Sequence, residues 1–139
     1  LEKLRFGNDF IYQINIAGAG VEARYIPTLI IQPFVENAVK HGLLHKKGKK
    51  ELILDFVAED KATIVKIKDN GIGRKRSEEI RQQGSMAHRS FATGAVQKRL
   101  ELLNKGADFT ITYQVADLSD EDGKPSGTEI ILRFGEKAL

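Results

Sequence analysis

Apolar and polar residues alternate along the first part of the chain. Large apolar residues occupy every second position at Phe10, Tyr12, Ile14 and Ile16. A period of two is typical of a β-strand, because successive side chains of a strand point to opposite faces. The AGAG run at residues 17–20 predicts the end of this strand.

A second pattern, with helical spacing, begins after Ile26 and centres on the run PFVENAVKHG at residues 33–42. At about 100° per residue, the apolar residues of this run share one side of a helix and the polar residues share the other. The polar residues are Glu36, Asn37, Lys40 and His41. Pro27 suits a first helical turn, Pro33 predicts a distorted turn before the run, and Gly42 predicts the end of the helix. An ordinary solvated helix face would give the same pattern.

Strands and short helices alternate through the rest of the chain. Two strand-like runs, at residues 51–59 and 62–69, are joined by a two-residue turn and predict an antiparallel hairpin. The later expected elements are a short polar helix at 74–83, a mobile loop at 84–93, a helix at 94–105, a strand at 109–115, an acidic loop at 117–127 and a closing strand at 128–134. Strands paired mainly as hairpins, with helices between them, predict an α+β two-layer sandwich rather than a doubly wound parallel sheet.

Length and composition fit one globular domain that spans residues 1–139. The chain is 41% hydrophobic and 29% charged, which is ordinary for a folded domain. It has no cysteine, which excludes disulfides and thiolate metal sites. The net charge of +3 says little about partners, and the basic run HKKGKK at residues 45–50 lacks the aromatic residues that would favour a nucleic-acid surface. We interpret this run as a solvated loop and expect no nucleic-acid partner.

The first residues, LEKLRF, give no sign of a signal peptide. No apolar run approaches the roughly 20 residues that span a bilayer. The chain opens without methionine in a helix-like stretch, as though cut from a longer protein. We therefore expect a cytoplasmic domain, with a membrane segment possible upstream.

The run DNGIGR at residues 69–74 has features of a ligand-binding turn. Gly71 and Gly73 allow a positive φ and a close approach of the backbone to a ligand. Asp69 offers a carboxylate that accepts hydrogen bonds and would match the exocyclic amine of adenine but repel the carbonyl of guanine. Asp-Asn-Gly is also a common turn, so this run alone leaves both interpretations open.

Together, the runs PFVENAVKHG, DNGIGR, RLELLN and GTEIIL resemble the ATP-binding domain of sensor histidine kinases, which has the Bergerat or GHKL fold. Residues 26–42 closely match the pattern I-P-x-x-x-x-Q-P-F-V-E-N-A-x-K-H-G of the LytS-type subfamily. The resemblance covers essentially the whole chain. It implies a mixed, mostly antiparallel sheet with helices on one face, and it makes residues 1–6 the end of a linker helix from a dimerisation region.

The resemblance implies a catalytic role for three polar residues of the helix. Asn37 would coordinate the Mg²⁺ that bridges the ATP phosphates, and Glu36 would orient or polarise a group near the γ-phosphate. Lys40 would contact phosphate, and His41 would lie against the nucleotide. A hard oxygen ligand suits Mg²⁺ and a cation suits a polyphosphate, so these roles are chemically reasonable.

At the other end of the nucleotide, the resemblance implies that Asp69 binds the adenine amine. Gly71, Ile72 and Gly73 would shape the adenine pocket. Thr128, in GTEIIL, would support Asp69 from a neighbouring strand.

The expected glycine-rich lid is the point where the chain departs from the family pattern. Residues 88–95 read HRSFATGA, with Ser90 and Ala92 in place of glycines. They resemble a His-Lys-Ser type of lid, which would let Arg89 or Ser90 contact phosphate. A disordered polar loop is the alternative.

The resemblance predicts the catalytic domain of a two-component kinase, which positions Mg-ATP for transfer of the γ-phosphoryl group to a histidine elsewhere. The implied cofactors are ATP and Mg²⁺. The implied partners are the dimerisation and phosphoacceptor region of the same kinase, a downstream response regulator and a second copy in the full-length protein, which we expect to be anchored in the plasma membrane. The alternative is a GHKL-type ATPase that uses Glu36 as a base for water. A P-loop motif is missing from the sequence.

Overall fold

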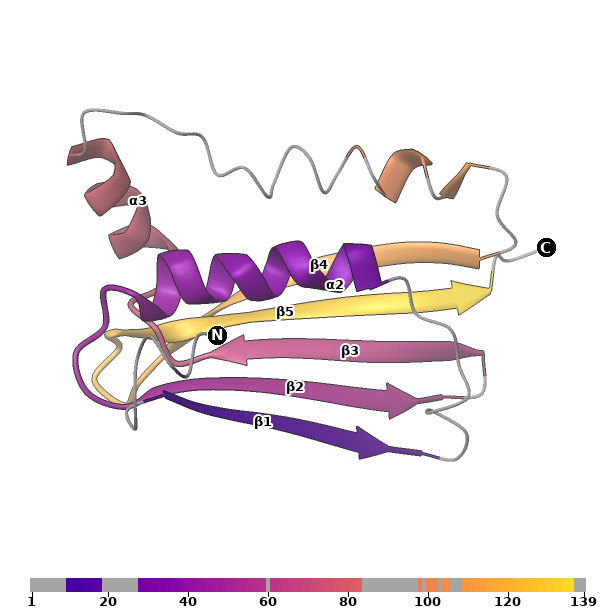
Figure 1. Cartoon of the computed structure of the whole chain (residues 1–139), viewed down its shortest axis with the longest axis horizontal. Helices are drawn as coiled ribbons and strands as arrows, with labels where there is room; N and C mark the ends of the chain where they lie inside the picture. Colours follow the sequence, from indigo (N-terminus) through magenta and orange to yellow (C-terminus); the bar gives the residue numbers. More distant parts are fainter. Residues whose placement is uncertain are drawn as a thin grey trace.

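The computed structural model of the chain describes residues 10–18, 28–59, 61–83, 98, 100–102, 104–105 and 109–136. Its strands are β1 (Phe10–Ala17), β2 (Lys50–Ala58), β3 (Ala62–Asp69), β4 (Phe109–Ser119) and β5 (Pro125–Glu136). Its helices are α2 (Thr28–Asn37), the π-helical segment η3 (Ala38–Leu43) and α3 (Arg74–Gln83) (Figure 1).

The strands form one sheet in the order β1-β2-β3-β5-β4. The β1–β2 pair is parallel, whereas β2–β3, β3–β5 and β4–β5 are antiparallel. Figure 1 shows α2 lying along the sheet and α3 standing at one end of it. The predicted α+β two-layer architecture, with a mixed and mostly antiparallel sheet, is therefore confirmed.

The core lies between the sheet and the apolar side of α2 and η3. Alternate residues of the inner strands point to this side, as the period of two requires. The buried strand residues include Leu52, Val65, Ile67 and Leu132, and they cluster with Phe34, Ala38, Val39 and Leu43 of the helix. The helical spacing seen in the sequence thus marks the face that holds the helix to the sheet. By contrast, every β1 side chain after Phe10 is exposed.

The sequence predicts that the helix ends at Gly42, but in the structure it continues past this residue. The backbone continues as η3 to Leu43, and the N–H of Leu44 donates to the carbonyl of Val39 at 2.8 Å. This five-residue spacing is the π-helical pattern. Leu43 is fully buried, and the burial of its side chain favours one more helical residue after the glycine. Pro33 lies inside α2, so the distortion in this helix comes after Asn37 rather than before Pro33.

The acidic loop predicted at residues 117–127 is too long. β4 continues to Ser119 and β5 begins at Pro125. The short turn between them is held by the Asp120 side chain, which accepts from the N–H groups of Asp122 and Lys124, both at 2.9 Å. Polar residues at the ends of a hairpin carry no strong strand pattern, which is why the sequence suggested a loop.

Other predicted elements are present. The β2–β3 hairpin and α3 occupy the expected positions, and Leu100 of the expected helix at 94–105 is buried. The Asn104 amide bonds both backbone groups of Ile111 on β4, as donor at 3.1 Å and acceptor at 2.8 Å.

The expected loop at 84–93 and linker at 1–6 lie outside the described residues. Among the described helices, none is long and apolar enough to cross a membrane.

Candidate functional site

Asp69, at the end of β3, is the most buried charged residue in the described part of the chain, with 5% of its surface exposed. Its Oδ1 accepts a hydrogen bond from the Gly71 N–H at 2.8 Å. Thr128 pairs with Asp69 in the β3–β5 ladder, and its backbone also bonds the carboxyl group. The structure therefore brings together Asp69, Gly71 and Thr128. With Ile72 and Gly73 we call these residues the turn cluster.

Burial raises the pKa of Asp69 from 3.8 to about 6. The hydrogen bonds from Gly71 and Thr128 and the positive charge of Lys46 act in the opposite direction. Because these stabilising contacts limit the rise, the side chain is mainly a carboxylate at pH 7. A largely dehydrated carboxylate can then serve as a hydrogen-bond acceptor for a ligand.

Gly42, at the end of the PFVENAVKHG run, is packed directly against the turn cluster. A Cβ on Gly42 would lie 2.7 Å from Asp69 Oδ1, and a Cβ on Gly71 would collide with the Gly42 backbone. The Ile72 N–H donates to the Gly42 carbonyl at 3.0 Å. The sequence indicates Gly42 only as a helix end and does not reveal this contact. The sequence feature that hints at this contact is the position of Gly42 at the end of a motif rich in polar residues.

Two further glycines shape the same end of the sheet. Gly73 has φ +85, and its carbonyl accepts from the Ser77 N–H in the first turn of α3. Gly127 has φ +134, and a Cβ there would collide with the Asp69 carbonyl. The glycine of GTEIIL is thus required by close backbone packing, which the sequence alone does not reveal.

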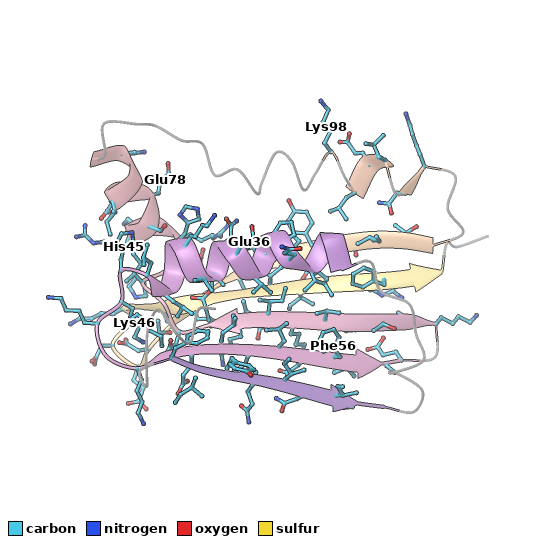
Figure 2. All side chains as sticks on the ribbon, in the orientation of Figure 1. Glu36, His45, Lys46, Phe56, Glu78 and Lys98 are labelled. Carbon is cyan, nitrogen blue, oxygen red and sulfur yellow. The ribbon has the colours of Figure 1, made fainter. Side chains whose placement is uncertain are left out.

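The basic run at residues 45–50 is not a uniformly solvated loop. Lys46 Nζ donates to the Asn70 carbonyl at 2.5 Å, and Lys50 Nζ donates to the Lys46 carbonyl at 2.6 Å. Lys50 is buried, whereas Lys47 and Lys49 are exposed. The solvated interpretation therefore holds for only part of the run. Figure 2 shows His45 and Lys46 just beyond the end of the helix.

Asn70 joins this loop to the end of β3. Its Oδ1 accepts from the Glu51 N–H at 2.7 Å, and its Nδ2 donates to the Lys49 carbonyl at 3.2 Å. The Asn70 N–H also donates to the Glu51 carbonyl at 3.2 Å. The Asp-Asn-Gly sequence is thus tied to β2 by its side chain as well as by its backbone.

The polar residues of the helix lie at the junction of α2 and η3. Glu36 and Lys40 are exposed, and Asn37 and His41 are half-buried. Gln32 Nε2 donates to Glu36 Oε1 at 3.1 Å. Figure 2 shows Glu36 partway along the helix. We call Glu36, Asn37, Lys40 and His41 the helix group, and Gly42 is the backbone link from it to the turn cluster.

Two of the expected phosphate contacts and the expected metal site remain to be described. Arg89 and Ser90 lie outside the described residues. In the part of the chain that is described, no group of three His, Cys, Asp or Glu residues is placed to hold a metal ion. Asn37 is thus a candidate single ligand, beside which a nucleotide could supply phosphate oxygens.

Two curated proteins are related to the chain in sequence. The sensor protein LytS of Staphylococcus haemolyticus is 36% identical over 75 residues, which are 52% of this chain and 12% of that protein. The sensor protein LytS of Staphylococcus saprophyticus is 27% identical over 116 residues, which are 84% of this chain and 19% of that protein. The chain therefore spans a fifth or less of these relatives. No protein-family model matches it.

Solved structures share the fold at low sequence identity. The mycobacterial sensor histidine kinase MprB has a TM-score of 0.58 at 13% identity, with 99% of this chain and 90% of that chain covered. The catalytic domain of histidine kinase ThkA has a TM-score of 0.57 at 10% identity, with 99% and 86% covered. The chain has the GHKL-type fold of a histidine kinase catalytic domain, and its sequence is related to that of LytS sensor proteins.

Proposed function

We propose that the chain is the ATP-binding catalytic domain of a two-component sensor histidine kinase. In this proposal it binds Mg-ATP and positions the γ-phosphoryl group for transfer to a histidine in the kinase's dimerisation region. The observation that carries the proposal is Asp69: a buried carboxylate in a glycine-lined turn, packed against the helix that bears Glu36 and Asn37. The relatedness to LytS sensor proteins supports it.

Asp69 gives the site its preference for adenine. Its Oδ1 already accepts from Gly71, so the carboxylate is held in one orientation while acceptor capacity remains. The exocyclic amine of adenine would donate to it, whereas the carbonyl of guanine at the same position would be repelled. Gly71, Ile72 and Gly73 would let the base approach the backbone, and Thr128 would hold Asp69 from β5.

The helix group would act on the phosphates. Asn37 would coordinate Mg²⁺, which neutralises charge on the transferring group, and Mg²⁺ commonly takes its other ligands from phosphate and water. Lys40 would contact phosphate, His41 would lie against the nucleotide, and Glu36 would orient a group near the γ-phosphate. Arg89 or Ser90 would contact phosphate from the lid. Such positioning and charge neutralisation are what phosphoryl transfer chiefly requires.

The wider organisation is part of the same proposal. Residues 1–139 would form one catalytic domain, with residues 1–6 as the end of a linker helix. The full-length protein would be a membrane-anchored homodimer that passes the phosphoryl group to a response regulator. The relatives are sensor proteins, which favours a kinase over a GHKL-type ATPase that uses Glu36 to activate water.

Calorimetry with Mg-ATP and Mg-GTP tests the adenine assignment. We expect the wild type to favour ATP by about 10-fold to 100-fold, because a hydrogen bond to a charged group contributes about 1.5–3 kcal/mol. Asp69→Asn should weaken ATP binding and reduce the preference, since an amide can donate to guanine. Asp55→Asn makes the same chemical change at a residue that bonds Asn15, away from the turn cluster, and should bind like the wild type. Equal affinities for ATP and GTP in the wild type would refute the assignment.

A further inference from the structure

We propose that Lys46 is a positioning residue for the adenine end of the site, which holds the Asp69–Asn70 turn in place and supplies positive charge to the Asp69 carboxylate. The inference rests on the proposed nucleotide function. It gives a role to a lysine that follows the motif helix and that neither the motif nor the relatives' names assign.

The first support is the position of the Lys46 side chain. It is half-buried, and its ammonium group donates to the carbonyl of Asn70, the residue between Asp69 and Gly71. The Lys46 carbonyl in turn accepts from the buried Lys50 at the start of β2. The loop is therefore fixed at both its backbone and its side chain, so the charge of Lys46 stays beside the turn.

The second support is the set of charges around Asp69. Lys46 is the charged residue whose attraction opposes the rise in the pKa of Asp69. Lys50 lies on β2 on the same side of the sheet as Asp69, because it is two residues from Leu52, the partner of Asp69 in the ladder. His41 precedes Gly42 in η3. Across the sheet, Asp117 pairs with Thr128 in register, but Arg74 bonds it through two contacts of 2.7 Å. Lys46 is thus a local counter-charge that adds to the larger effect of the hydrogen bonds from Gly71 and Thr128 in opposing the rise in the pKa of Asp69.

The consequence is a pH limit on adenine recognition. Asp69 must be ionised to accept from the adenine amine at its free oxygen. Because the positive charge of Lys46 favours the ionised form, its removal should raise the pKa of Asp69 further above its value of about 6. ATP affinity would then fall more at pH 6.5 than at pH 8.5, where the carboxyl group is ionised with or without the Lys46 charge.

Four variants separate the charge from its alternatives. Lys46→Met removes both the charge and the hydrogen bond, and Lys46→Gln removes the charge but keeps a donor for the Asn70 carbonyl. Lys46→Arg retains the charge. Lys47→Met removes an equal charge from an exposed neighbour in the same loop, which controls for general attraction of the polyphosphate.

The primary measurement is a carbon-13 NMR titration of the Asp69 carboxyl in the free domain, assigned with Asp69→Asn, with the His41 ring followed in the same samples. Calorimetry with Mg-ATP at pH 6.5 and 8.5 accompanies it. We expect Lys46→Met and Lys46→Gln to raise the pKa of Asp69, and Lys46→Arg and Lys47→Met to leave it near the wild-type value. If Lys46→Met does not fold, Lys46→Gln and Lys46→Arg carry the comparison.

The outcomes distinguish two failures. If the Asp69 pKa is the same in Lys46→Gln as in Lys47→Met, the role of Lys46 is refuted, whatever the nucleotide affinity. If the pKa rises as expected but ATP affinity does not depend on Asp69, the positioning role in the free domain holds and the proposed nucleotide function fails.

Discussion

The turn cluster and the helix group are two parts of one candidate site, and they are built in opposite ways. Asp69 is 5% exposed and held by backbone hydrogen bonds, and Gly42 and Gly71 meet backbone to backbone. Glu36 and Lys40, by contrast, are exposed. The turn cluster is therefore part of the folded framework, whereas Glu36 and Lys40 project from it, and Asn37 and His41 of the helix group are half-buried.

This difference predicts how substitutions will act. A buried, close-packed group cannot change without strain or a lost hydrogen bond, so changes in the turn cluster should reduce stability as well as binding. Side chains outside the core contribute less to folding, so changes in the helix group should affect chemistry much more than stability. Measurements of stability on the isolated domain can test this division.

Gly71→Ala should have the largest effect on folding. A Cβ there would collide with the Gly42 backbone, which cannot rotate away as a side chain can, so we expect a loss of about 3 kcal/mol or more. Urea unfolding measures it. Gly48→Ala is the control: a Cβ at Gly48 meets nothing, and only its φ of +87 costs about 1 kcal/mol. Similar losses in the two variants would show that the Gly42–Gly71 contact is not tightly packed.

The pH dependence of stability should report Asp69. Its pKa rises from 3.8 to about 6 on folding, so the native state holds the extra proton between these values. This contribution to stability is complete below about pH 4 and is lost as the pH rises through 6. Asp69→Asn lacks this titration, so relative to the wild type it should gain about 1–3 kcal/mol between pH 4 and pH 8. Parallel stability profiles of the two proteins would contradict the raised pKa.

Asn37→Ala should have the smallest effect on folding and a complete effect on transfer. We expect its free energy of unfolding to stay within about 0.5 kcal/mol of the wild type. A full-length kinase should lose autophosphorylation if Asn37 is the Mg²⁺ ligand of the proposed function. Phe34→Ala, on the buried side of the same helix, should instead lose about 3–5 kcal/mol. An Asn37→Ala domain that unfolds would place Asn37 in the framework with the turn cluster.

The sequence predicted those parts of the fold that depend on local pattern. The period of two located β2 and β3, and the glycine-rich DNGIGR run placed the turn after β3 correctly. The π-helical turns of η3 were not predicted, because they depend on the burial of Leu43 in the core rather than on any residue preference in the run AVKHGL.

The same limit explains which site residues were missed. Gly42, Gly127 and Lys46 all act through contacts with Asp69 or Asn70, which are distant in sequence. Such contacts exist only after β3, β5 and the loop before β2 have come together. Asp69 itself was predicted because its chemistry is carried by its own carboxylate and the adjacent glycines.

The Asn104 amide has a consequence for self-association. β4 is an outer strand of the sheet, and such a strand presents free backbone groups to which another chain can add as a further strand, a common route to aggregation. Asn104 occupies the N–H and carbonyl of Ile111 at once. At Ile111 both backbone groups are therefore occupied, so a single amide side chain interrupts the row of groups with which a sixth strand would have to pair.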